Sequence, residues 1–297
     1  MSIQISFRKG LPYKTALRCL SSTANIKPVD LASTTYENSN LGATKAPFVI
    51  AHGLFGSKSN WASLCKHYSQ KIGKVIALDL RNHGESVHAN EHTYYHLVED
   101  VRHFLLKNGI DKIRLMGHSM GGRCAMLFAL TYPEMLEKLI IVDISPSTAS
   151  PQLIELPKMI NAMQSVIMPE NVSLTKARAI VDQQLAKTFS SKDVRSFILT
   201  NLIAKKNSYK WRLNVPVLEQ SFNNIATFPE LNSATYNGAT LFIGGGISDF
   251  LPKSDFPKIQ KLFPKAELKY IEGAGHWVHA EKPNEFLKLT LDFLNKP

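Results

Sequence analysis

The chain has 297 residues, of which 44% are hydrophobic and 20% charged, so it can bury one sizeable core and is expected to form one α/β domain with an insertion. A formal net charge of +11 would suit nucleic acid, but the lysines are scattered and no DNA- or RNA-reading motif occurs, which argues against that class of protein. No apolar run reaches the ~18 residues that span a bilayer, so no transmembrane segment is expected. The cysteines, which form no metal-binding spacing and cannot all pair, indicate a reducing compartment; they are Cys19, Cys65 and Cys124.

The first 29 residues have the composition of a mitochondrial transit peptide. They contain five basic residues and several serines, and the first acid is Asp30. The run Arg18-Cys19-Leu20-Ser21-Ser22 also resembles a matrix-protease cleavage site. We therefore predict a transit peptide over residues 1–29 and a location in the mitochondrial matrix. The alternative is a disordered basic tail, because Gly10 and Pro12 interrupt the amphipathic helix of such peptides.

From about residue 30 onward, strand patterns alternate with helix patterns. All strand candidates but the last are nearly continuous apolar runs, which is expected where helices cover both faces of a parallel sheet. The predicted strands are 47–53, 74–80, 112–117, 138–144, 239–245 and 267–273. The predicted helices are 61–72, 92–107, 120–130 and 284–294.

One long interval breaks this alternation. Residues 145–237 contain no pattern of a central strand, only helical patterns and several prolines. The sequence therefore predicts a core formed by residues 30–144 and 238–297, with residues 145–237 inserted as a helical cap, or lid.

A serine stands where a predicted strand meets a predicted helix. The run Gly117-His118-Ser119-Met120-Gly121 fits G-x-S-x-G, in which a strained strand-to-helix turn exposes the serine hydroxyl. The amide of Met120 lies at the first turn of the helix, where unpaired N–H groups favour a developing negative charge. We predict that Ser119 is a nucleophile and that Met120 supplies one oxyanion-hole N–H.

The glycine-rich corner after the first predicted strand indicates a second oxyanion donor. It reads His52-Gly53-Leu54-Phe55-Gly56, and a loop at this position supplies a backbone N–H to the oxyanion in enzymes with a G-x-S-x-G elbow. The N–H in question belongs to the residue after His-Gly, so we predict that the backbone of Leu54 supplies the second oxyanion donor. The alternative for this corner alone is an ordinary β-turn.

A serine hydroxyl needs a base to take its proton and an acid to orient that base. Among ten histidines, His276 follows the last predicted strand in a small-residue loop and comes after every candidate acid, giving the chain order serine, acid, histidine. Two acids satisfy that order: Asp143 at the end of strand 138–144, and Asp249 in the loop after strand 239–245. The position at a strand end holds a carboxylate more rigidly, so Asp143 is predicted and Asp249 kept in reserve.

From about Pro47 to Phe293 the sequence resembles an α/β-hydrolase, and more narrowly the family of abhydrolase-domain-containing protein eleven and its bacterial esterase relatives. The strings that carry the resemblance are HGLFGSKSNW, DLRNHGES, GHSMGG, VDISP, YKWRLN and GAGHWVHAEKP. The resemblance implies the α/β-hydrolase fold, serine esterase or lipase activity on small acyl esters or lipids, a mitochondrial location, and no metal or cofactor. It also favours Asp143, because the family's acid lies in the V-D-I-S-P segment.

Two other functions fit the same residues. Some yeast relatives pass an acetyl group from acetyl-CoA to ethanol, so an alcohol acyltransferase using the same triad is the alternative to a hydrolase. A non-catalytic binding protein on a hydrolase scaffold is less favoured, because every catalytic position is filled. Phe55, Met120 and Trp277 adjoin the predicted catalytic groups and are candidates to line an apolar acyl pocket; the alternative is that they belong to the core. The sequence does not identify a protein partner.

Overall fold

The computed structural model describes residues 26–38, 46–147, 156–231 and 234–296. Almost all of the predicted transit peptide, including the cleavage site predicted near Ser21, lies outside the described residues.

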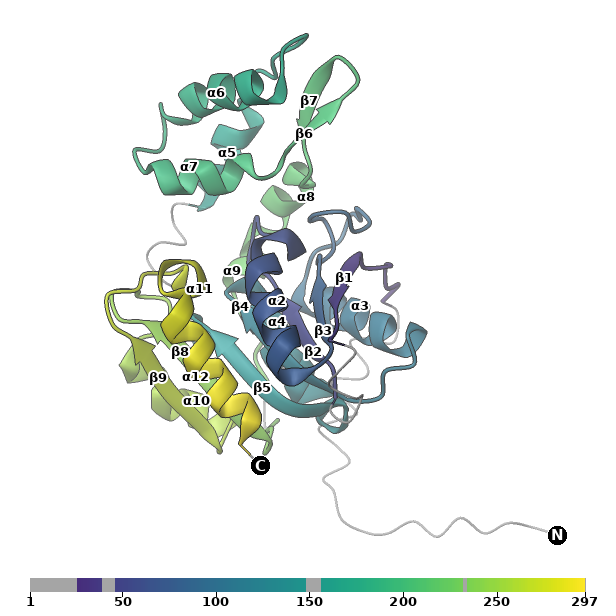
Figure 1. Ribbon diagram of the computed structural model, residues 1–297, viewed down its shortest axis with the longest axis vertical. Coiled ribbons are helices and arrows are strands. Elements are labelled where there is room, and N and C mark those ends of the chain that lie inside the picture. The colour runs from purple at the N-terminus through teal and green to yellow at the C-terminus, as the bar shows by residue number, and fades with distance from the viewer. Residues whose placement is uncertain (1–25, 39–45, 148–155, 232–233, 297) are drawn as a thin grey trace, which may run out of the picture.

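A seven-stranded sheet in the order β1-β3-β2-β4-β5-β8-β9 forms the centre of the molecule (Figure 1). Six strands are parallel, as the apolar runs predicted, and β1 pairs antiparallel with β3 at one edge. The sequence did not predict β1, because its four residues, STTY, are polar or partly exposed. The strands are β1 (Ser33–Tyr36), β2 (Phe48–Ala51), β3 (Val75–Leu78), β4 (Ile113–His118), β5 (Leu136–Val142), β8 (Ala239–Gly245) and β9 (Ala266–Ile271).

Helices cover both faces of this sheet because alternate strand residues point to opposite sides. Phe48 and Ile50 of β2 belong to the core under α2 (Ala62–Ile72), α11 (Val278–Glu281) and α12 (Pro283–Asn295). Val49 and Ala51 belong to the core under α3 (Tyr94–Lys107), α4 (Met120–Thr131) and α10 (Phe256–Leu262). Among the described residues, the core also contains three short 3-10 helices: η1 (Lys58–Trp61), η2 (Pro133–Met135) and η4 (Lys253–Asp255).

The segment between β5 and β8 forms a cap at one end of the sheet (Figure 1). It is mainly helical, but it also contains a two-stranded antiparallel hairpin that the sequence did not predict. The hairpin strands are short and carry exposed lysines, so they give no apolar run. The cap elements are α5 (Leu156–Gln164), α6 (Leu174–Leu185), α7 (Lys192–Leu199), β6 (Leu202–Lys205), β7 (Ser208–Trp211), α8 (Val215–Gln220) and α9 (Phe222–Ala226).

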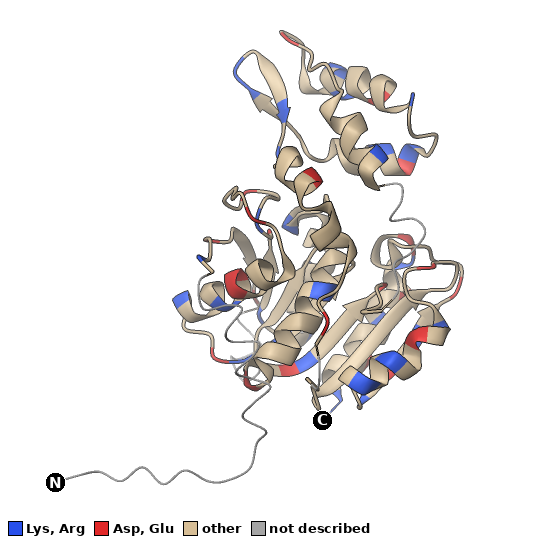
Figure 2. Cartoon of the chain, turned by 180° about the vertical axis from the view of Figure 1, so that it is seen from behind, with Lys and Arg blue, Asp and Glu red and all other residues tan. Residues whose placement is uncertain are grey.

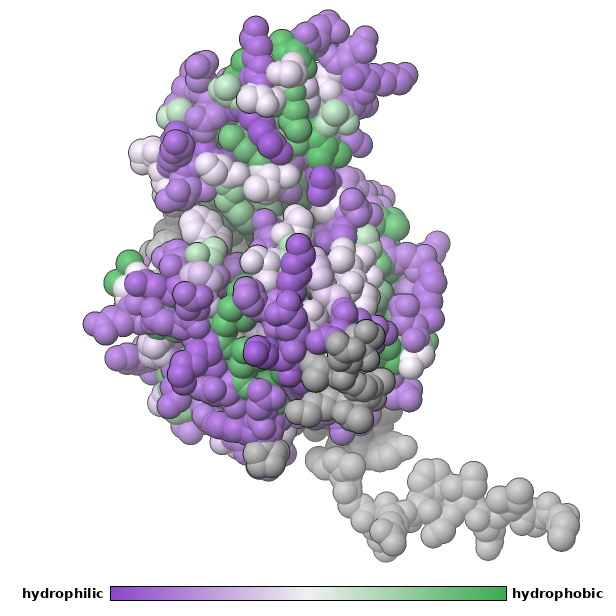
Figure 3. Space-filling model, viewed as in Figure 1, coloured by the Kyte–Doolittle hydropathy of each residue, from purple (hydrophilic) through white to green (hydrophobic). Residues whose placement is uncertain are grey.

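The surface carries its charge in dispersed form. Figure 2 shows Lys and Arg positions spread over both the core and the cap rather than joined in one stripe. The face seen in Figure 3 is mostly hydrophilic, with apolar atoms in separate spots. Within the described part of the chain, no helix is both long enough and apolar enough to cross a membrane.

Candidate active site

Ser119 occupies the sharp turn between β4 and α4. Its backbone is in the left-handed region, with φ 52° and ψ −118°, which an L-residue adopts only when its surroundings enforce it. The helix can start so abruptly because it lies directly against β2: a Cβ on Gly121 would be 2.5 Å from the carbonyl oxygens of Ala51 and His52. Gly117 is equally crowded, since its Cβ would be 2.1 Å from the Gly121 oxygen.

Asp143 follows the last residue of β5 directly and is fully buried. Its Oδ2 accepts a 2.7 Å hydrogen bond from Nδ1 of His276, and its Oδ1 accepts a 2.9 Å hydrogen bond from the Gly245 amide. The Ser248 hydroxyl donates a further hydrogen bond to Oδ2. Between the two candidate acids, Asp143 is therefore the one whose carboxylate the structure brings to the imidazole.

The loop after β8, which contains the reserve acid Asp249, contacts the imidazole in another way. The Phe250 ring stacks on the His276 ring, with centroids 3.9 Å apart and planes 24° from parallel. Ser248 from the same loop holds Asp143. The sequence analysis did not identify either residue. A hydroxyl and an aromatic residue in a glycine-rich loop are equally compatible with an ordinary turn.

Hydrogen bonds from two other segments fix the backbone of the loop that carries His276. His118 donates from Nε2 to the carbonyl oxygen of His276 at 2.9 Å. Glu281 of α11 accepts from the amides of Gly275 and Trp277, at 2.7 Å and 3.2 Å. Glu281 was also missed by the sequence analysis, because a glutamate on a short helix has no distinguishing pattern. These bonds fix the backbone on either side of the imidazole.

The second glycine-rich corner lies beside the serine. A Cβ on Gly53 would be 3.1 Å from Cβ of Ser119. His52 fixes the start of this corner, because its Nδ1 donates to the Gly53 carbonyl at 2.8 Å and its Nε2 accepts from the Leu80 amide at 3.0 Å. Leu54 is half-buried and lies in the wall of the same cavity as Met120, Ser119 and His276.

That cavity has a volume of about 420 Å³, which is within the range of small-molecule sites. Phe55 and Trp277, the predicted substrate-binding residues, both line it, and Phe197 of the cap packs against Trp277 with centroids 5.5 Å apart. Its lining is largely apolar and comes from core and cap together. The cap side consists of Leu156, Met159, Phe189, Val194, Phe197 and Ile225.

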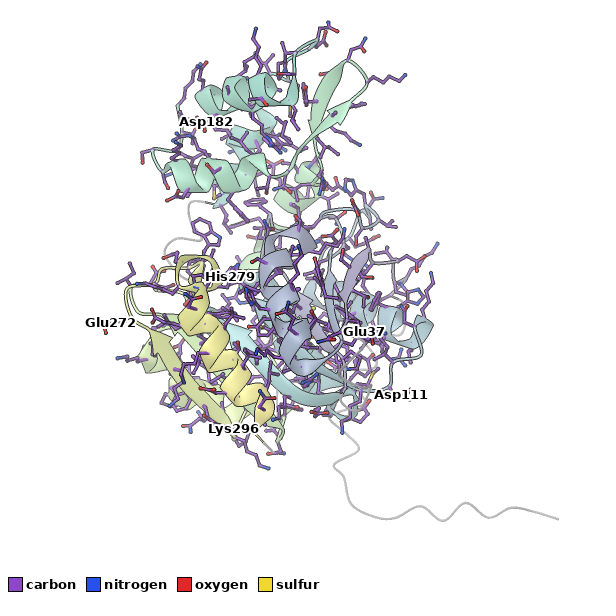
Figure 4. The ribbon with its side chains drawn as sticks, viewed as in Figure 1. Glu37, Asp111, Asp182, Glu272, His279 and Lys296 are labelled. Carbon is purple, nitrogen blue, oxygen red and sulfur yellow. The ribbon has the colours of Figure 1, made fainter. Side chains whose placement is uncertain are left out.

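Burial favours the neutral form of five histidines around this site. Burial is the largest cause that lowers the pKa of each, to about 3 for His92 and His279. The geometry agrees for His52 and His83, since one ring nitrogen of each accepts a backbone N–H and so carries no proton. His279, labelled in Figure 4 on α11, stacks on Trp61 at 4.1 Å, and its Nδ1 has no hydrogen-bond partner in the described part of the molecule. The five are His52, His83, His92, His118 and His279.

A family model described as the alpha/beta hydrolase fold matches residues 46–283. The chain belongs to the α/β-hydrolase family. This confirms the fold class that the sequence predicted. A solved marine microorganism esterase has a TM-score of 0.82 and 32% identity, covering 89% of this chain and 99% of that one.

Named relatives narrow the family. The sn-1-specific diacylglycerol lipase ABHD11 of Danio rerio is 41% identical over 274 residues, which are 92% of this chain and 85% of that protein. Esterase YbfF of Escherichia coli is 31% identical, covering 84% of this chain and 93% of that protein. A Saccharomyces cerevisiae protein named probable alcohol acetyltransferase is 32% identical, over 86% of this chain and 79% of that protein. The resemblance to the ABHD11 family and to bacterial esterases is confirmed, and the chain is a carboxylic-ester hydrolase.

The buried neutral histidines predict a pH-dependent stability. In the unfolded chain their pKa is near 6.5, so below that pH unfolding takes up protons that the folded state does not bind. The free energy of unfolding should therefore fall as pH decreases, by at most ~1.4 kcal/mol per pH unit for each such histidine. Urea unfolding at pH 7.5 and 5.5 measures the fall.

His279→Leu should lower the number of protons taken up on unfolding by about one, because it removes one buried imidazole, and should therefore make the free energy of unfolding less dependent on pH. His67→Gln, at an exposed histidine, should keep the wild-type dependence. A free energy of unfolding that does not change between the two pH values would contradict the prediction.

Proposed function

We propose that the enzyme hydrolyses acyl esters of glycerolipids, with diacylglycerols as the substrate class, through a Ser119–His276–Asp143 triad. The observation that carries the proposal is the hydrogen bond that His276 donates to the buried Asp143, because His276 lies with Ser119 in the wall of a largely apolar cavity. A diacylglycerol offers long acyl chains for that apolar lining, and the lipase names of the relatives favour the same class.

In the proposed mechanism, His276 accepts the Ser119 proton at Nε2 as the serine oxygen attacks the ester carbonyl. The amides of Leu54 and Met120 stabilise the oxyanion. The imidazolium then protonates the leaving alcohol, and an acyl-enzyme remains on Ser119. Water attacks this ester in the second half of the cycle, with His276 again as base, and free fatty acid leaves.

A fluorophosphonate probe tests the nucleophile. It should label the wild-type protein once, at Ser119, and Ser119→Ala should abolish both labelling and the release of fatty acid from a long-chain diacylglycerol in mixed micelles. Folding of the variant is checked by far-UV circular dichroism. With ethanol present, free acid should remain the main product; a predominance of ethyl ester would favour the acyltransferase. Retained hydrolysis by folded Ser119→Ala would refute the mechanism.

The two acids give a second prediction. Asp143→Asn should lower kcat by roughly 10⁴ while the protein stays folded, because the side-chain amide stabilises the wrong tautomer of His276 and no imidazolium partner remains. Asp249→Asn is the matched control in the reserve position and should cost far less. Both variants are compared by steady-state kinetics on a p-nitrophenyl ester. The reverse order of activities would transfer the role of acid to Asp249.

We also propose import into the mitochondrial matrix, on the basis of the basic, acid-free leader. Protein recovered from mitochondria should begin close to Ser21, as determined by N-terminal sequencing. Deletion of residues 1–20 should leave esterase activity intact and keep the protein out of mitochondria. An intact Met1 on the mitochondrial protein would contradict this proposal.

A further inference from the structure

The backbone of Phe55 is held from two sides. Its φ of 61° lies in the left-handed region, which a bulky residue rarely adopts. Its N–H donates to Nε2 of His83 at 3.2 Å, and its carbonyl oxygen accepts from Nδ2 of Asn201 at 2.8 Å. Phe55 directly follows Leu54, so these two bonds fix the peptide groups next to the proposed oxyanion donor.

His83 can act only as an acceptor toward Phe55. Its Nδ1 donates to the carbonyl oxygen of Arg81 at 2.9 Å, so in the neutral ring Nε2 carries the lone pair. Arg81 is itself fixed, because its guanidinium makes two hydrogen bonds to Asp100, at 2.6 Å and 2.7 Å, and both side chains are fully buried. The acceptor that the core offers to the Phe55 N–H is therefore held rigidly.

Asn201 comes from the cap, in the connection between α7 and β6, and is 2% exposed. Its own backbone is fixed within the cap, since its N–H donates to Ile198 at 3.0 Å and its carbonyl oxygen accepts from the Arg212 amide at 2.8 Å. The side-chain amide thus connects the cap to the glycine-rich corner His52–Gly56 of the core, here called the oxyanion loop. If the cap separates from the core, the Phe55 carbonyl loses this donor.

We propose that Asn201 and His83 are positioning residues that set the oxyanion loop, and that Asn201 couples the seating of the cap to formation of the oxyanion hole. This inference rests on the proposed function, in which the Leu54 amide stabilises the oxyanion. A left-handed Phe55 relaxes when its backbone bonds are lost, and the adjacent Leu54 amide turns with it. Such a change weakens transition-state stabilisation and leaves ground-state binding intact, so it lowers kcat and not substrate affinity.

The test compares two substitutions in the cap. Asn201→Asp keeps the size of the side chain but removes the N–H donor; it should lower kcat about 10- to 100-fold with little change in KM. Inhibition by a trifluoromethyl ketone, which forms an oxyanion adduct with the serine, should weaken by a similar factor. The matched control is Ser173→Ala, which removes the N-cap of α6; because the Ser173 hydroxyl accepts from the Lys176 amide within the cap, kcat should stay unchanged.

An unchanged kcat in folded Asn201→Asp, or an equal loss in Ser173→Ala, would overturn the inference. If Asn201→Asp does not fold, His83 decides: His83→Gln retains an acceptor and a donor and should keep more activity than His83→Leu, and equal activity of the two would overturn the inference. Fluorophosphonate labelling of the wild type separates this result from the proposed function, because absence of labelling at Ser119 contradicts the triad itself.

Discussion

The site depends on backbone conformations that most of the chain avoids. Phe55, Ser119 and Asp143 all have positive φ, and they follow β2, β4 and β5, three neighbouring strands of the sheet. Each left-handed residue costs on the order of 1–3 kcal/mol, so all three require surroundings that leave no alternative. For Ser119 the surroundings are the contact between α4 and β2; for Phe55 they are hydrogen bonds. The sheet places the three strained residues together because parallel strands all end at the same edge.

The loop after β3 carries the DLRNHGES string, residues 79–86. None of these residues lines the cavity, yet they hold the segments that do. Asp79 accepts from both the backbone and the ammonium group of Lys58, each at 2.6 Å, and so holds the segment that follows the glycine-rich corner His52–Gly56. Asn82 bonds to Asn214 of the cap, whose amide donates to the Asn82 carbonyl at 3.0 Å. Through Arg81 and His83 as well, this loop connects the glycine-rich corner, the core and the cap. Its residues support the site from outside, by hydrogen bonds to backbone groups.

The sequence predicted those parts of the fold that depend on regular patterns. The sequence predicted six strands to within a few residues, five of them from nearly continuous apolar runs, and glycine spacing placed Ser119 at the turn between a strand and a helix. Patterns failed where a single polar side chain fixes a neighbouring group. Ser248 and Asn201 bond to a carboxylate and a carbonyl group more than 100 residues away in sequence, so spacing does not reveal them. Glu281 bonds to amides only four and six residues away, but a single glutamate on a short helix forms no periodic pattern. The hairpin β6–β7 was missed for a related reason, since two four-residue strands with exposed lysines cannot be told from a loop.

The choice between two candidate acids shows the limit of chain order as an argument. Asp143 and Asp249 are equivalent in order, yet they differ in how the sheet holds them. The amide of Asp143 donates to the Ile243 carbonyl of β8 at 2.8 Å, so this residue continues the ladder between two central strands. The loop after β8 then supplies a hydroxyl to that carboxylate and an aromatic face to the imidazole. The imidazole is thus held by a carboxylate at its Nδ1 and by Phe250 across its plane. An acid that belongs to the sheet needs no ordering when substrate arrives, because its orientation is fixed by the same hydrogen bonds that fix the strands.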